Sequence, residues 1–160
     1  MILLTVGSQL PFDRLVRFVD DWAGQNPGVK VFGQIGETRY QPKHFEAVRL
    51  VAPDYLAELA SSSEMLIAHA GMGSIFLAFQ CGKPIVIVPR RADLAEIRND
   101  HQLATAKRFR GREGIAVALE VQELPRILER RSELLGMKDF PAFADDRLLA
   151  RLRSWISTDR

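Results

Sequence analysis

The sequence predicts an α/β protein with a doubly wound, Rossmann-like parallel sheet, and two observations carry this prediction. Short apolar runs alternate with segments of helical periodicity, at spacings typical of right-handed βαβ crossovers. Two of these runs end in glycine-containing turns, which are typical of the sheet edge where open parallel sheets bind ligands. With 47% hydrophobic residues, the chain has enough apolar surface for one core, so we expect a single domain over residues 1–160.

The first third of the chain predicts three strands and two helices. The expected strands are Ile2–Val6, Val29–Phe32 and Ala47–Val51, and the expected helices are Phe12–Gln25 and Pro53–Ser61. Each helix follows or begins at a proline, a residue that favours the first helical turn. The first strand ends at Gly7 and Ser8, and the polar segment 37–45, with His44, is expected to be a surface loop.

The central segment predicts a complete βαβ unit. An apolar run from Met65 to Ala68 reaches His69, then a turn with Gly71, Gly73 and Ser74, and then a segment typical of a helix. Glycines allow close approach of a ligand to the backbone, and the amides and dipole at a helix start attract anions, so the turn predicts a phosphate site. The strand Ile85–Val88 follows, and Pro89, Arg90 and Arg91 close it.

The last third predicts a helix from about Arg98 to Arg110, a strand Ile115–Leu119, a helix Val121–Leu135 and a connection from Gly136 to Phe143. Asp145 is expected to cap a final helix. That helix carries an apolar stripe made of Leu148, Leu149, Leu152, Trp155 and Ile156. The stripe either docks a partner or packs on the protein's own sheet.

Composition excludes several classes of protein. A net charge of +2, with basic and acidic residues interspersed, gives no indication of a nucleic-acid partner. The only cysteine, Cys81, predicts neither a disulfide framework nor a metal site, which fits a reducing, cytosolic compartment. The N-terminal apolar run is too short for a membrane span and lacks the basic residues of a signal peptide. We expect no cofactor and no metal.

Four motifs together carry a resemblance to a known family. They are VGSQLPFDRLV at the start, HAGMGS after the fourth strand, GKPIVIVPR around the fifth, and NDHQLATA at a helix start. In this order they resemble the C-terminal, nucleotide-sugar-binding half of GT-B glycosyltransferases of the MurG type, family 28. The similarity is greatest to small stand-alone members, namely PssE-like exopolysaccharide subunits and the catalytic subunit of the two-part dolichol-pathway N-acetylglucosaminyltransferase. It covers nearly the whole chain.

The resemblance implies a site as well as a fold. Gly7 and Ser8 would form the first loop facing the cleft, and the diphosphate of a UDP-sugar would lie against His69, Gly71, Gly73 and Ser74. Gln102, with Asn99, Asp100 and His101, would face the sugar. Many family members hold the ribose with a glutamate eight residues after the histidine. Here that position is Leu77, so diphosphate is better indicated than uridine.

Each site residue also has a structural interpretation. His69 would then be a buried histidine, Gly71 and Gly73 ordinary turn glycines, and Asp100 a helix cap. Arg90 and Arg91 are better interpreted as a solvated loop pair than as a phosphate clamp, and Cys81 as part of helix packing. The sequence identifies no general base.

The resemblance implies the donor-binding, catalytic subunit of a heteromeric UDP-sugar hexosyltransferase of exopolysaccharide or lipid-linked glycan synthesis. A membrane-anchored, PssD-like second subunit would carry the acceptor site and hold the chain at the inner face of the plasma membrane. The alternative is a non-catalytic nucleotide-binding or regulatory domain of the same fold, which the leucine at position 77 favours.

Overall fold

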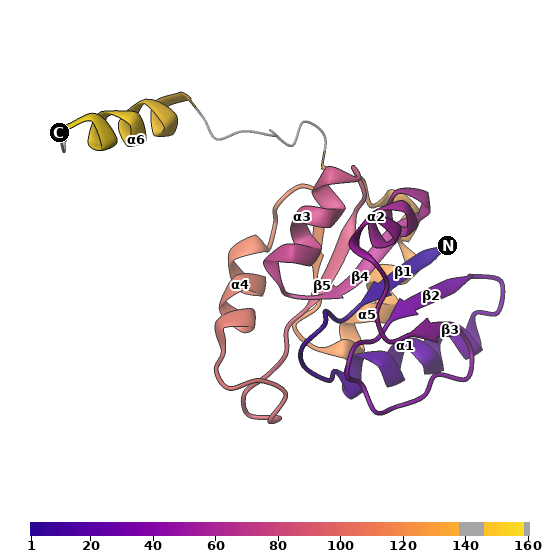
Figure 1. The fold of residues 1–160 in the computed structure, drawn as a ribbon. Helices are drawn as coiled ribbons and strands as arrows, with labels where there is room; N and C mark the ends of the chain where they lie inside the picture. The colour runs from indigo at the N-terminus through magenta and orange to yellow at the C-terminus, as the bar shows by residue number, and fades with distance from the viewer. Residues whose placement is uncertain (138–145, 159–160) are drawn as a thin grey trace.

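The computed structural model describes residues 1–137 and 146–158, and its centre is a six-stranded sheet (Figure 1). All strands run parallel, in the order β3-β2-β1-β4-β5-β6. Their bounds are β1 Ile2–Thr5, β2 Val31–Gln34, β3 Glu46–Val48, β4 Met65–His69, β5 Ile85–Val88 and β6 Ile115–Val117. The predicted fold class is therefore confirmed, and the predicted strands differ from the observed ones only at their ends.

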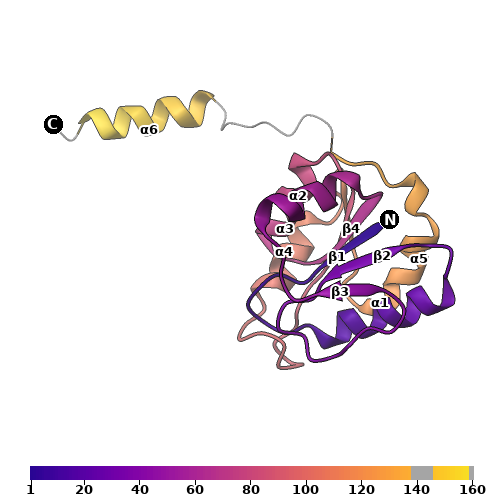
Figure 2. The same cartoon turned by 45° about the vertical axis from the view of Figure 1, so that its right-hand side comes forward.

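Helices cover both faces of the sheet (Figure 2). One face packs against α1 (Asp13–Gln25) and α5 (Leu124–Glu129), and the other against α2 (Pro53–Ser62), α3 (Met72–Gln80) and α4 (His101–Phe109). Alternate residues of β1 pack on opposite faces of the sheet. Ile2 and Leu4 belong to the apolar cluster with α1 and α5, and Leu3 belongs to the cluster with α2, α3 and α4. A strand buried on both faces must be apolar throughout, which explains the uninterrupted apolar runs.

The segment after β6 differs from the prediction of one helix over Val121–Leu135. It contains a 3₁₀ turn η1 (Val121–Glu123), the short helix α5 and a second 3₁₀ turn η2 (Arg131–Glu133). Pro125, which has no backbone N–H, lies in the first turn of α5, where the missing donor costs little. The α-helix therefore begins at Leu124, one residue before this proline, and not at residue 121.

The final helix, α6 (Asp146–Thr158), lies apart from the sheet in both views (Figures 1 and 2). Its apolar side chains are exposed, with Leu152 at 42%, Trp155 at 62% and Ile156 at 76%. The alternative that the stripe packs on the protein's own sheet is therefore wrong for these residues. The predicted cap Asp145 and most of the predicted connection lie outside the described residues. None of the described helices is long and apolar enough to cross a membrane.

Candidate functional site

The candidate site lies where the strand order reverses. β1 and β4 are neighbours, and the chain continues from β1 toward β2 on one side and from β4 toward β5 on the other. The loops that leave these two strands therefore diverge and open a crevice at their carboxyl ends, which is the usual ligand site of such sheets. A cavity of about 1040 Å³ lies there.

The floor of the cavity is built around the imidazole of His69, the last residue of β4. Gly7 packs on one part of the ring, because a Cβ there would lie 2.9 Å from Cε1, and its φ of +80° also favours glycine. A Cβ on Gly71 would lie only 2.1 Å from Nε2. Gly36 in turn packs on Gly7, whose carbonyl oxygen would be 2.6 Å from an added Cβ. These glycines therefore fix the ring in place.

Burial, together with a smaller effect of the positive charge of Arg90, lowers the pKa of His69 to about 4, while the Thr5 backbone acts in the opposite direction. The imidazole is thus neutral at pH 7. Its Nδ1 atom is buried and makes no hydrogen bond of good geometry, although the Thr5 backbone is close enough to affect the pKa. A neutral ring offers one N–H donor and one acceptor, whose positions the glycine contacts fix.

Helix α3 presents its N-terminus to the cavity through Gly73 and Ser74. Its N-cap residue, Gly71, has no side chain that could accept from the first-turn amides, so these N–H groups have no capping acceptor at this position. A Cβ on Gly73 would meet nothing within 4 Å, which leaves the backbone open to a ligand. The turn thus combines uncapped amides, the positive end of the helix dipole and an unobstructed approach.

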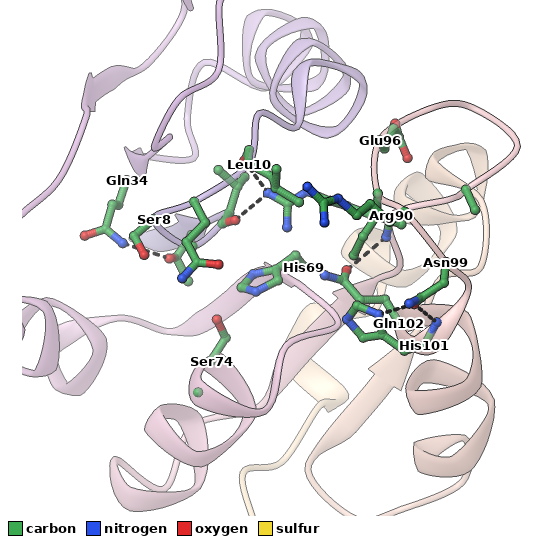
Figure 3. Close-up of a pocket in the computed structure, with 18 of the residues that line it drawn as sticks. Ser8, Leu10, Gln34, His69, Ser74, Arg90, Glu96, Asn99, His101 and Gln102 are labelled. Carbon is green, nitrogen blue, oxygen red and sulfur yellow. Dashed lines mark hydrogen bonds between the residues drawn. The ribbon is translucent and has the colours of Figure 1, made fainter.

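The opposite wall comes from the end of β5 and the start of α4, and Figure 3 shows Arg90 and Gln102 there. The prediction that Arg90 belongs to a solvated loop pair is wrong, because its exposure is only 3%. Its backbone N–H donates to Gln102 Oε1 at 3.1 Å. Gln102 is buried as well, and its oxygen is occupied by this bond, so its amide group remains the hydrogen-bond donor beside the cavity.

Two neighbours of Gln102 line the cavity and one does not. Asn99 and His101 are exposed lining residues, and Asn99 Oδ1 accepts from the His101 backbone N–H at 3.2 Å. Asp100 occupies the N-cap position of α4 without a capping bond. Its carboxylate instead accepts from the Ala92 N–H at 3.2 Å, which ties the preceding loop to the helix. Asp100 therefore holds the loop between β5 and α4 in place.

The structure brings most of the predicted site residues together around one cavity. The lining includes Gly7, Ser8, His69, Gly73, Ser74, Asn99, His101 and Gln102. Gly71 and Asp100 are absent from the lining and support it from behind.

Sequence reasoning missed Gln34, at the end of β2, which also lines the cavity. Its amide donates to Thr5 Oγ1 at 3.3 Å and its oxygen accepts from the Val51 N–H at 3.1 Å. A polar residue at the carboxyl end of a predicted strand was a usable signal. Leu56 and Leu77 also line the cavity.

Residues 1–145 match the glycosyltransferase family 28 C-terminal domain. Two solved glycosyltransferases share the fold. The glycotransferase of kitacinnamycin has a TM-score of 0.55 and 21% identity, over 83% of this chain and 37% of that chain. CalG4, the calicheamicin glycosyltransferase, has a TM-score of 0.56 and 20% identity, over 81% of this chain and 34% of that chain. The chain thus spans about a third of each, and no curated protein matches it.

Proposed function

Because the chain belongs to the glycosyltransferase family 28 C-terminal domain family, whose members bind UDP-sugar donors, we propose that it is the donor-binding, catalytic subunit of a UDP-sugar hexosyltransferase. We further propose that the complete enzyme is heteromeric and acts in exopolysaccharide or lipid-linked glycan synthesis. The observation that carries the proposal is the cavity at the β1/β4 switch point, where the uncapped start of α3 and the fixed ring of His69 meet.

The geometry suits the chemistry of sugar transfer. As the anomeric C–O bond breaks, negative charge develops on the leaving diphosphate. Fixed donors that already point at that charge stabilise the transition state without reorganising. The first-turn amides of α3 next to Gly73 are such donors, since they do not have to move. The neutral imidazole of His69 adds a fixed polar group without a charge of its own, and it can donate only through the one ring nitrogen that carries the proton.

We assign the two ends of the cavity by their chemistry. Asn99, His101 and Gln102 form a polar end that matches the hydroxyl groups of a hexose. Leu56 and Leu77 offer apolar surface that suits a nucleobase and one face of its ribose. With the diphosphate at the start of α3, a nucleotide sugar would span both ends. This orientation follows the family resemblance, with leucine in place of the usual glutamate at position 77.

A second subunit is proposed to complete the active site. Glu96 is the one carboxylate among the described residues that line the cavity, and Arg14 holds it through two contacts of 2.8 Å, from Nε and Nη2. The Arg91 backbone N–H also donates to it, at 2.9 Å. Both oxygens of this carboxylate are thus already bonded to donors of the protein, so it is not placed to take a proton from an acceptor. We therefore assign the acceptor site and the base to a membrane-anchored, PssD-like partner, and place the complex at the inner face of the plasma membrane.

The exposed stripe of α6 is the proposed dock for that partner. Trp155 and Ile156 form its most exposed part, and a large aromatic side chain is a common anchor in protein interfaces. The alternative function, a non-catalytic nucleotide-binding or regulatory domain, is favoured by Leu77, because an absent ribose contact would weaken donor binding.

Calorimetric titration of the purified chain with UDP and uridine tests the donor assignment. UDP should bind at least about ten-fold more tightly, because charge-assisted hydrogen bonds lie at the diphosphate. Equal affinities would refute the assignment. Adding UDP-sugar to the chain, with and without its co-expressed partner, separates the two functions: an enzyme subunit transfers sugar only with the partner, and a regulatory domain binds donor but supports no transfer.

A further inference from the structure

Arg90 has surroundings that an arginine of a solvated loop does not have. It follows the end of β5 by two residues, and its exposure is only 3%. The next residue, Arg91, forms ion pairs with Asp93 and Glu120 and has no place in the cavity lining. Arg90 lies in the cavity lining and forms no ion pair within the described part of the chain. A buried cation without an ion-pair partner is costly and therefore requires an explanation.

The side chain of Arg90 holds the loop that follows β1. Its Nη2 donates to the carbonyl oxygens of Val6 at 2.7 Å and Leu10 at 2.6 Å, and its Nε donates to that of Pro11 at 3.2 Å. The guanidinium also lies 4.8 Å from the centre of the Phe12 ring, an attractive cation–π contact. Four residues of the β1–α1 connection thus contact this one side chain.

This loop contains Gly7, which packs on the His69 ring, and Ser8, which lines the cavity. The shape that Arg90 imposes is therefore passed on to the floor of the donor site. The charge of Arg90 remains in place as well, because burial lowers its pKa only to about 10. Figure 3 shows His69 between Arg90 and Ser74, so Arg90 and the α3 N-terminus flank the ring.

We propose that Arg90 is the positioning residue of the donor site, a proposal that rests on the proposed function. Arg90 shapes the β1–α1 loop and supplies the fixed positive charge opposite the α3 N-terminus. Three carbonyl oxygens accept from Nε and Nη2 but carry only partial negative charge. Glu96 is close enough to act on the charge of the guanidinium, but it forms no ion pair with Arg90 and is already bonded to Arg14. A diphosphate in the cavity would supply the missing negative charge. The nucleoside, which is uncharged, would depend on the loop shape alone.

Two substitutions separate the roles of shape and charge. Arg90→Lys keeps the charge and loses the forked contacts to the loop. We expect this variant to weaken the binding of UDP and of uridine to a similar extent, so that the ratio of the two affinities stays within about three-fold of the original. Arg90→Gln removes the charge and keeps a donor for one carbonyl. We expect it to weaken UDP at least about ten-fold more than uridine.

Arg91→Gln is the matched control, since it removes the same charge one residue away and should leave both affinities unchanged. Titration calorimetry with UDP and uridine supplies the measurements, and circular dichroism shows which variants fold. An unchanged affinity ratio in Arg90→Gln, or an equal change in Arg91→Gln, would overturn the role of the charge. Unchanged uridine binding in Arg90→Lys would overturn the role in loop shape, and this variant remains decisive if Arg90→Gln does not fold. If the original chain binds UDP no more tightly than uridine, the proposed function itself fails.

Discussion

Gly71 and Gly73 belong to one turn, two residues apart, and the structure gives them opposite surroundings. An added Cβ at Gly71 would lie 2.1 Å from His69 Nε2, whereas at Gly73 it would meet nothing within 4 Å. Gly71 thus belongs to the packed floor of the cavity, with Gly7 and His69, and Gly73 belongs to its open rim, with Ser8, Asn99 and His101. Substitutions in the floor should therefore affect folding first, and substitutions in the rim should affect binding alone.

The largest expected effect comes from introducing the same side chain at the two glycines. Gly71→Val would push the His69 ring away from Gly7, and overpacking of this kind costs about 1 to 3 kcal/mol of unfolding free energy. Gly73→Val should leave the unfolding free energy within about 1 kcal/mol and abolish UDP binding, because its side chain would occupy the approach to the α3 amides. Urea denaturation and UDP titration of both variants provide the measurements. Equal loss of stability at the two positions would remove the distinction between floor and rim.

The pH dependence of folding tests the floor in a second way. The pKa of His69 is about 4 in the folded chain and near 6.5 in the unfolded one, so the unfolded state binds more protons between these values. The contribution of His69 to the unfolding free energy should therefore be fully present above pH 6.5. It should be lost as the pH drops toward 4, by an amount on the order of 3 kcal/mol.

His69→Gln removes this contribution and should flatten the stability curve over the same range. His101→Gln, at an exposed rim histidine, serves as the control and should keep the original slope. Urea denaturation at successive pH values measures both variants. A slope that His69→Gln leaves unchanged would mean that another group titrates.

The contrast between the two glycines also shows what the sequence can predict. Strand and helix positions follow from hydrophobic periodicity, so β5 was predicted to the residue, and the edge that carries His69 and the glycine turn was predicted from the end of a strand. The different surroundings of Gly71 and Gly73 could not be predicted, because those of Gly71 depend on the orientation of the His69 ring, which only the folded backbone defines.

The burial of Arg90 was missed for a similar reason. Its partners Val6, Leu10 and Pro11 are carbonyl groups about 80 residues earlier in the chain, and such groups have no signature in side-chain sequence. The single domain over residues 1–160 stays a prediction.

A smaller effect is expected at Gln102, which shares features of the floor and the rim. Its side-chain oxygen accepts from the Arg90 backbone N–H, and its amide group lies at the cavity. Gln102→Ala should therefore weaken the binding of UDP-sugar by about 1 to 3 kcal/mol and the binding of UDP slightly. Asn99→Ala, at the exposed rim, should weaken UDP-sugar and spare UDP. Titrations of both variants with UDP-sugar and UDP provide the comparison. Identical losses for the two ligands in Gln102→Ala would make this residue purely structural.

The smallest effect on the stability of the chain itself is expected from α6, which lies outside both the floor and the rim. Trp155 and Ile156 are exposed at 62% and 76%, so replacing both with alanine removes little buried surface. The unfolding free energy of the isolated chain should change by no more than about 0.5 kcal/mol.

If α6 docks the proposed partner, the same double variant should lose the co-purifying complex, because a truncated aromatic anchor costs about 2 kcal/mol or more at an interface. Arg153→Ala, on the same helix but outside the apolar stripe, is the control and should keep the complex. Pull-down of the tagged chain with its co-expressed partner, alongside thermal melting, measures both quantities. An intact complex in the double variant would show that the partner binds elsewhere, and a large drop in melting temperature would contradict the exposure of the stripe in the structure.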